Sequence, residues 1–399
     1  MKIFFSRRFW LYTASIVLGI LCGLSGISFL IGLGNFCAEA FIRIFKCVSM
    51  PLIFLSVIMA FLAFERNQKS SKIVKKTLLY TVGTTVVAAC VSAVLYCVIR
   101  PGNVISLPRN QEIHRAGKGY WQYVIDVIPD GIFSAFSNHK ALSVLLIGVV
   151  FGATIKFIKD ERAKQVIISF FTGIHSMLFT ATHHMVKVLP IGLFGFVTVS
   201  VVQANGDMNI GEMGKYFSVI VLSNIVQGLV VLPLWLYLER INPMKIFKGM
   251  LPALATAFFC KSSAGALPVT LDCAENRLKI DKSTGNFVIP LCTTVNMNGC
   301  AAFIFTTVTY LMQNNGVAIS IPFVLTCICV ATVAAIGNAS VPMGCFFMSA
   351  SLLSAMDIPI SLMGIILPFY SIIDMIESAL NVWSDSCVAT VIDREMKKI

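Results

Sequence analysis

The sequence predicts an all-α polytopic membrane protein. Three observations support this: the composition, the length of the apolar segments and the position of the basic residues. Of the 399 residues, 57% are hydrophobic and 13% are charged, and the mean hydropathy is +0.84. Soluble domains carry about 25% charged residues, so a soluble globular enzyme is excluded. A transmembrane β-barrel would alternate apolar and polar residues in segments of about 10, which the long apolar segments do not do.

The apolar segments of residues 1–250 have the length of membrane helices. A helix needs about 20 apolar residues to cross the hydrocarbon core of a bilayer. We expect the fourth segment to be broken, because it contains Pro129 and the polar stretch 137–140. The predicted segments are Trp10 to Gly32, Phe41 to Phe64, Leu78 to Val98, Val124 to Phe157, Ile168 to Val202 and Phe217 to Tyr237.

Basic residues gather in the short loops at 66–76, 156–164 and 240–248 and in the C-terminal tail. These loops lie on one side in an alternating count, and the positive-inside rule assigns that side to the cytoplasm. Loop 100–122, on the opposite side, also carries basic residues, so the positive-inside rule is obeyed on balance and not strictly. We therefore expect a multi-pass protein of the cell (inner) membrane with cytoplasmic N- and C-termini. Membrane topology accounts for the net charge of +12, and no nucleic-acid partner is expected.

The 13 cysteines lie mostly within apolar segments and form no CxxC motif. Buried thiols of this kind usually pack as small apolar side chains, so we expect them to be reduced. His183 and His184 are adjacent, and neighbouring residues of a helix point apart. We therefore expect no transition-metal site.

After residue 250 the apolar segments become short and interrupted. Residues 261–268 (KSSAGALP) break one segment, and residues 337–342 (GNASVP) break another. Unpaired backbone groups cannot face lipid, so irregular backbone at membrane depth must line a cavity or contact a ligand. Paired interruptions in two halves predict inverted repeats around a binding site near the membrane midplane.

The last apolar segment carries Asp374, Glu377, Ser378, Asn381 and Asp385. Their spacing places all five on one helical face. A carboxylate within a membrane costs about 2.5–3.5 kcal/mol, so such residues normally face water, an ion or a partner. The alternative is a solvated cytoplasmic helix end, for which Asp385 is the best candidate.

Polar residues also interrupt the segment around Asn296, Asn298 and Gly299. Asn and Gly here free backbone carbonyl oxygens, and carbonyls beside a carboxylate suit a hard monovalent cation. Helix packing through small and polar residues is the competing interpretation.

Together these motifs resemble the dicarboxylate/amino acid:cation symporters, the glutamate-transporter family, over nearly the whole chain. The last-helix sequence ESALN (377–381) is most similar to the serine/threonine-transporting branch, which has Glu-Thr-Ala-Leu-Asn. The stretches that carry the resemblance are 41–54, 190–194, 262–270, the NMNGC sequence at 296–300, 337–342 and 374–385.

The resemblance implies eight transmembrane helices, two re-entrant helical hairpins and a homotrimer that works by an elevator mechanism. Residues 1–250 would form the six-helix N-terminal part: the scaffold and trimerisation helices plus two helices of the mobile domain. Residues 251–399 would form the C-terminal transport core, with hairpin 1, helix 7, hairpin 2 and helix 8. The second hairpin would be the outer gate.

The resemblance also implies the site residues. Asp374 would bind the substrate α-amino group, and Asn381 and Ser263 would hold its α-carboxylate. The full set of expected substrate-binding residues is Ser263, Cys300, Ala339, Ser340, Val341, Asp374, Glu377, Ser378 and Asn381. The expected Na⁺-binding residues are Thr84, Thr85, Cys292, Thr294, Asn296, Asn298, Ala335, Ile336, Asn338, Asn381 and Asp385.

Departures from the family pattern indicate the substrate. Members that carry acidic substrates have an Arg where this chain has Glu377, and a glutamate there would repel a second carboxylate at a cost of several kcal/mol. Cys300 stands where the family has Thr. We therefore expect a small neutral amino acid of the serine, threonine or alanine type. Glu377 has two further interpretations: it pairs with Lys261, or it binds a cationic side chain. The alternatives are an acidic amino acid/dicarboxylate symporter and a cationic amino acid/cystine transporter.

Asn298 replaces the aspartate of the family motif, so we expect a weakened third cation site. Na⁺ is the expected coupling ion, with H⁺ as an alternative, and no cofactor is expected. The chain has no Walker A motif, HExxH motif or close nucleophile–base pair, so we do not expect an enzyme.

Overall fold

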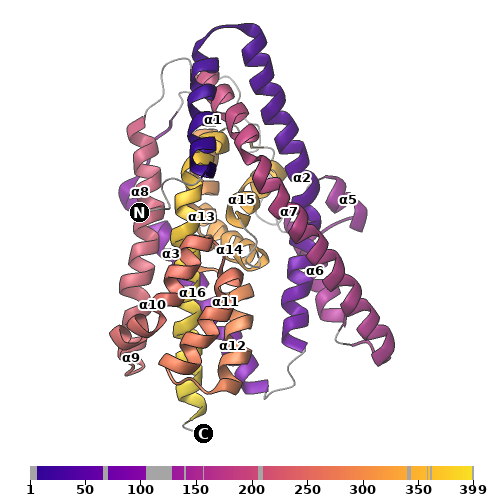
Figure 1. The fold of residues 1–399 in the computed structure, drawn as a ribbon, viewed down its shortest axis with the longest axis vertical. Helices are drawn as coiled ribbons and strands as arrows, with labels where there is room; N and C mark the ends of the chain where they lie inside the picture. Colours follow the sequence, from indigo (N-terminus) through magenta and orange to yellow (C-terminus); the bar gives the residue numbers. More distant parts are fainter. Residues whose placement is uncertain are drawn as a thin grey trace.

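The computed structural model describes residues 7–65, 71–104, 128–138, 141–155, 157–204, 210–338, 343–356, 358–359 and 362–397. All regular elements of these residues are helical (Figure 1). The first half contains α1 (Arg7–Leu24), α2 (Ser28–Glu65), α3 (Ser71–Ile99), α5 (Ile132–Ser137), α6 (Ala141–Ile155), α7 (Glu161–Ala204), α8 (Ile210–Val226), the π-helical turn η2 (Gln227–Val231) and α9 (Leu232–Leu238). The second half contains α10 (Pro243–Cys260), α11 (Ser263–Asp272), the π-helical turn η3 (Cys273–Arg277), α12 (Lys282–Val295), α13 (Asn298–Asn314), α14 (Ile321–Gly337), α15 (Gly344–Ala355) and α16 (Met363–Met396).

The helices confirm the predicted all-α membrane class. Among the described residues, three helical stretches are long and apolar enough to cross a membrane: Ile73–Ile99, Gly211–Leu238 and Lys282–Asn314. Shorter apolar helices accompany them, including Ile321–Gly337 and Gly344–Leu353. Large apolar side chains such as Phe29 and Leu229 are exposed on the outer surface, as lipid contact requires.

The boundary between the first two helices differs from the prediction. The sequence predicts a break between residues 32 and 41, but the chain turns at residues 25–27, where Gly26 has a φ of +67°, and α2 then runs unbroken to Glu65. Gly34 serves packing instead, because a Cβ there would lie 2.5 Å from a methyl carbon of Thr198 on α7. Small residues allow membrane helices to approach closely.

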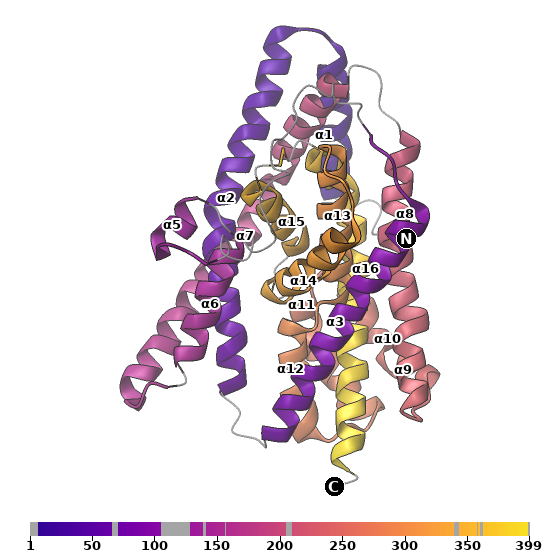
Figure 2. The ribbon, with the colours of Figure 1, turned by 180° about the vertical axis from the view of Figure 1, so that it is seen from behind.

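Helices α1, α2, α6 and α7 pack together on one side of the molecule (Figures 1 and 2). The α2 and α7 backbones are so close that a Cβ on Gly195 would lie 2.4 Å from the Ala38 amide nitrogen. Phe41 and Phe196 add an edge-to-face ring pair, with centroids 5.9 Å apart. The predicted broken segment is divided between α5 and α6.

The second half of the chain surrounds α16. Helices α8 and α9 lie on the side opposite α2 and α7, with α16 between the two groups, and α3 crosses α16 diagonally (Figures 1 and 2). Helix α10 packs against α16. Helices α10 and α11 form one hairpin, and α14 and α15 form another. Residue 250, the predicted boundary between the N-terminal part and the transport core, lies within α10, which begins at Pro243.

Three interruptions position the candidate site. Lys261 ends α10 in the left-handed conformation, with φ +55°. Met343, before α15, has φ +58°. Such backbone is strained for residues other than Gly and is stabilised by its surroundings. The helix break predicted at Asn296 is confirmed, since α12 ends at Val295 and α13 begins at Asn298.

Candidate substrate and cation site

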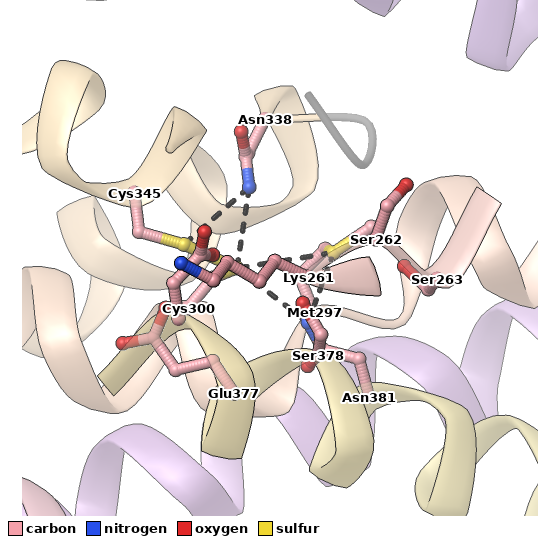
Figure 3. A pocket seen from close by; sticks show the side chains of 11 residues that line it. Lys261, Ser262, Ser263, Met297, Cys300, Asn338, Cys345, Glu377, Ser378 and Asn381 are labelled. Atoms are coloured by element: carbon pink, nitrogen blue, oxygen red, sulfur yellow. Dashed lines mark hydrogen bonds between the residues drawn. A yellow bond between two sulfur atoms is a disulfide. The ribbon is translucent and has the colours of Figure 1, made fainter. Parts of the chain in front are cut away.

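A pocket lies where the two hairpins meet the α12–α13 break and α16 (Figure 3). The space between its lining residues is about 250 Å³ and is partly open to solvent. The lining residues are Lys261, Ser262, Ser263, Met297, Cys300, Asn338, Cys345, Asp374, Glu377, Ser378 and Asn381.

The polar face of α16 is buried along its whole predicted length. Asp374, Glu377, Ser378 and Asn381 line the pocket, whereas Asp385 lies farther along α16 and is fully buried. Burial contradicts the alternative in which Asp385 is a solvated helix end. The five residues thus belong to two sites: four line the pocket, and Asp385 belongs to a separate polar cluster.

Asp374 and Glu377 are two buried carboxylates with a shared hydrogen-bond donor. The Tyr370 hydroxyl lies 3.4 Å from Asp374 Oδ1 and 3.3 Å from Glu377 Oε2, so it supports both weakly. Glu377 is 1% exposed, and its Oε1 atom accepts no hydrogen bond from any described residue. A buried carboxylate oxygen without a donor is costly, so this atom is suited to meeting a cation or a ligand donor.

The alternative interpretation, in which Lys261 pairs with Glu377, is not the arrangement of these side chains. Lys261 Nζ donates a hydrogen bond to Ser371 Oγ on α16, and its positive charge attracts Asp374.

The expectation that all cysteines are reduced is wrong for one pair. Cys300 on α13 and Cys345 on α15 form a disulfide, with Cα atoms 5.3 Å apart. The Asn338 amide nitrogen lies 3.2 Å from Cys300 Sγ and 3.4 Å from Cys345 Sγ (Figure 3). The sequence could not indicate this pair, because 45 residues separate the two cysteines and only the fold brings them together.

Asn381 ties α16 to the helix break. Its Oδ1 accepts the Gly299 amide at 2.9 Å, and its Nδ2 faces the sulfur atoms of Met297 and Cys300 at 3.5 and 3.6 Å. Sulfur is a weak acceptor, so these amide protons remain suited to a stronger one such as a carboxylate. Ser263, the first residue of α11, is buried at the same pocket.

A second polar cluster surrounds Asp385. Asn296 Nδ2 donates to Asp385 Oδ1 at 2.9 Å, and Thr293 Oγ1 lies 3.4 Å from Oδ2. Cys292, from the predicted set, is buried on the same helix as Thr293. Among the described residues no salt bridge to Asp385 is formed, so the positive charge of a bound cation would have no competitor there.

A hydrogen-bond network links α3 to the helix break. Thr84 Oγ1 donates to Asn296 Oδ1 at 2.9 Å, and Asn298 Nδ2 donates to the same oxygen at 2.8 Å. Gln227 Nε2 donates to Asn298 Oδ1 at 2.7 Å. Thr85, also predicted here, donates to the Thr81 carbonyl at 2.7 Å on its own helix.

Sequence reasoning missed two members of these clusters, Gln227 and Ser384. Ser384 Oγ accepts from both Asn296 and Asn298, at 2.8 and 2.9 Å. Ser384 adjoins Asp385 but lies outside the spacing that defined the predicted face. Gln227 is a polar residue within an apolar segment, and this signal could have identified it.

The remaining predicted cation residues are less connected. Thr294 Oγ1 donates to the Leu291 carbonyl at 2.8 Å, and the backbone N–H of Asn338 donates to the Ala335 carbonyl at 3.1 Å. Ile336 lies between Ala335 and Asn338, at the end of α14. Three further predicted substrate residues lie outside the described residues: Ala339, Ser340 and Val341.

Nearly the whole chain, residues 9–395, matches the family model described as the sodium:dicarboxylate symporter family. The chain belongs to this family. The resemblance inferred from the motifs is thereby confirmed.

Similar proteins include relatives named for two classes of substrate. Excitatory amino acid transporter 3 of Mus musculus is 26% identical over 460 residues, which cover 99% of this symporter and 87% of the relative. Neutral amino acid transporter B(0) of Mus musculus is 28% identical over 247 residues, covering 61% and 44%. Neutral amino acid transporter A of Bos taurus is 28% identical over 270 residues, covering 67% and 50%. Overall similarity therefore leaves the substrate open, and the residues of the pocket must decide it.

Proposed function

We propose that this symporter imports a small neutral amino acid of the serine, threonine or alanine type, coupled to an inward sodium gradient. The observation that supports the proposal most directly is Glu377, a buried carboxylate on the wall of the pocket. An acidic substrate would bring a further carboxylate beside Glu377 and Asp374. Like charges in a desolvated site cost several kcal/mol, whereas a neutral side chain pays no such cost.

The pocket offers complementary groups to both ends of an amino acid. Asp374 would attract the α-amino group, and the Asn381 amide with Ser263 would hold the α-carboxylate. Glu377 and Cys300 would then face the side chain. With Lys261 nearby, the charges of a zwitterionic substrate would be balanced within the pocket.

Sodium coupling would use the cluster around Asp385. A carboxylate with the Thr293 hydroxyl oxygen beside it offers hard oxygen ligands to a monovalent cation. Asn298 is neutral and is already hydrogen-bonded, so it would leave a weaker third cation site. We therefore propose that fewer sodium ions are coupled than in a transporter with the family's aspartate at this position.

The two alternative substrates have specific support. Similarity to a relative named as an excitatory amino acid transporter supports an acidic substrate for this protein. The unpartnered Oε1 of Glu377 favours a cationic side chain instead.

Uptake into proteoliposomes tests these three possibilities together. Radiolabelled serine, alanine, lysine and aspartate would each be offered with and without an inward sodium gradient. Sodium-dependent accumulation of serine or alanine, but not aspartate, is the expected result. Concentrative aspartate uptake would overturn the charge argument. Lysine accumulation would make Glu377 a ligand of the substrate side chain. Replacing the sodium gradient with a proton gradient tests which ion is coupled.

At the level of architecture we propose a homotrimer in the cell (inner) membrane, with α1, α2, α6 and α7 as the scaffold. The two hairpins, α12, α13 and α16 would form the transport core, joined by α3 and α8. The ends of α6, α9 and α16 and the starts of α3 and α10 lie at one end of the molecule (Figures 1 and 2), which supports a single cytoplasmic side for the basic loops.

A further inference from the structure

Three metal-ligating side chains from three helices meet in the pocket. Cys300 comes from α13, Cys345 from α15 and Glu377 from α16, and their ligand atoms all lie within 4.8 Å of one another. All three residues are buried, each at 3% exposure or less. Two thiolates and one carboxylate are a ligand set for a thiophilic divalent cation, and three protein ligands leave a fourth tetrahedral position for water or a solute.

The unpartnered oxygen of Glu377 points independently to a cation. Glu377 Oε1 has no hydrogen-bond donor among the described residues, while Oε2 accepts from Tyr370. The carboxylate is thus oriented through one oxygen, and the other remains available.

Asn338 provides the surroundings that a thiolate pair requires. Its amide nitrogen faces both sulfur atoms, and its Oδ1 points toward Gly344, where an added Cβ would lie 1.5 Å from that oxygen. N–H donors directed at ligand atoms orient the ligands and tune the metal. Met297 Sδ, 3.9 Å from Cys300 Sγ, adds a soft neighbour.

We propose that the reduced Cys300–Cys345 pair and Glu377 bind a zinc-class divalent cation within the pocket. Metal binding and the disulfide are alternative states of the same two sulfur atoms, because the thiolate is the form of cysteine that binds metal. Two thiolates, one carboxylate and a divalent cation leave one net negative charge, which Lys261 in the same pocket opposes. Binding itself does not depend on the identity of the substrate.

The consequence for transport rests on the proposed function. An ion shared by α13, α15 and α16 fixes the second arm of the second hairpin to the core of the pocket. Such an ion therefore inhibits the movement of that hairpin and occupies the side-chain end of the substrate site.

Titration of the purified full-length protein in detergent tests the proposal without a transport assay. Zn²⁺ binding would be measured by calorimetry on protein reduced with a phosphine, and Co²⁺ would report thiolate ligation through its charge-transfer band. We expect one tightly bound ion per chain. Cys345→Ser should weaken binding by more than about 100-fold, because even loss of a hydrogen-bond partner of a ligand costs about 10- to 100-fold.

Two controls make the result specific. Cys327→Ser removes a buried thiol of α14 outside the cluster and should leave Zn²⁺ affinity unchanged. Oxidation with oxidised glutathione, which takes two electrons and two protons from the thiol pair and yields two molecules of the reduced tripeptide, should abolish tight binding. Wild-type affinity in Cys345→Ser or in the oxidised protein would overturn the proposal.

X-ray absorption of the zinc-loaded wild type remains decisive if Cys345→Ser fails to fold. Two sulfur scatterers at about 2.3 Å and an oxygen ligand are expected. Ligation by nitrogen and oxygen alone would overturn the site. If the reduced wild-type protein binds no Zn²⁺ but takes up serine, this inference is refuted and the proposed transport function stands. If it binds Zn²⁺ at the two sulfur atoms but takes up no serine, the proposed transport function is refuted and the metal site stands.

Discussion

At the scale of single residues, Glu377 carries the argument for substrate choice. It is buried beside Asp374, and each of the two carboxylates lies within about 3.4 Å of the same tyrosine hydroxyl. The pocket therefore already contains two acidic groups, with Lys261 as the basic group that attracts Asp374. The side-chain carboxylate of an acidic substrate would therefore be repelled by the two acidic groups.

Reversing the charge of this side chain should reverse the preference. In Glu377→Arg, a guanidinium replaces the carboxylate and can pair with an acidic substrate side chain. We expect the ratio of aspartate to serine uptake to rise by at least about 100-fold, since several kcal/mol of repulsion are removed and each 1.4 kcal/mol is a factor of ten. Competitive uptake in proteoliposomes measures this ratio.

Glu377→Gln is the matched control, because it removes the charge and nearly keeps the size. It should retain serine uptake and gain little aspartate uptake. An unchanged aspartate-to-serine ratio in Glu377→Arg would show that residue 377 does not face the substrate side chain.

A second residue-scale prediction concerns ion coupling. Asn298 stands among Thr84, Asn296, Ser384 and Gln227, all joined by hydrogen bonds. Asn298→Asp adds a carboxylate to these oxygens and should create a stronger cation site. We expect one more sodium ion to move with each substrate, measured from the sodium gradient that balances a fixed substrate gradient.

Asn298→Ala provides the comparison, because a neutral side chain without oxygen adds no cation ligand. Its stoichiometry should equal that of the wild type. If Asn298→Asp also leaves the stoichiometry unchanged, the network around Thr84 does not bind a coupled ion.

At the scale of elements, the contact between α13 and α16 positions the pocket. Gly299 follows the helix break, and a Cβ there would lie 2.7 Å from Cα of Glu377. Backbone atoms cannot move aside as a side-chain end can, so this contact requires glycine. The same contact brings the Gly299 amide to the Asn381 side chain.

Gly299→Ala should therefore separate the two helices and destabilise the fold. Overpacking of this kind costs about 1–3 kcal/mol. We expect a lower Tm in detergent, followed by the fluorescence of a thiol-independent dye or by light scattering. Weakened substrate uptake should accompany it, because Glu377 and Asn381 lie at the contact.

Gly83→Ala on α3 controls for the intrinsic effect of the substitution, since nothing lies within 4 Å of an added Cβ there. Alanine favours helix over glycine by roughly 1 kcal/mol, so Gly83→Ala should be neutral or stabilising. Equal Tm changes in the two variants would contradict the proposed close contact.

At the scale of the whole molecule, the arrangement separates a long-helix group from the half that holds the pocket. Helices α2 and α7 approach closely at Gly34, Gly192 and Gly195, whereas the pocket lies among the hairpins and α16. Lys76 and Tyr80 of α3 bind Glu395 of α16 at 2.8 and 2.7 Å, which joins α3 to the second group. This division supports an elevator in which the group with the pocket moves against the other.

The same division predicts oligomerisation through the long-helix group. We expect particles of three 43.6 kDa chains, and native mass spectrometry in a mild detergent measures the mass directly. Dilution over a wide concentration range distinguishes a stable trimer from concentrated monomers. A mass of one chain at every concentration would contradict the proposed trimer.

The sequence by itself determined the membrane class, the α12–α13 break at Asn296 and the polar face from Asp374 to Asp385. Each of these follows from local physics: the cost of polar groups in lipid, the cost of an interrupted helix and the period of the helix. The break between the first two helices was misplaced: it was predicted between residues 32 and 41, but the chain turns at residues 25–27. Gly34 lies within α2 and packs against Thr198 of α7, which is distant in the sequence.

Only the tertiary structure decided which groups share one pocket. The Cys300–Cys345 pair, the hydrogen bonds of Gln227 and Ser384 and the partner of Lys261 all join residues of different helices. No periodicity within a helix encodes such contacts, since they arise from the way several helices pack around α16. The sequence thus identified the residues that lipid would not tolerate unpaired, and the fold determined their partners.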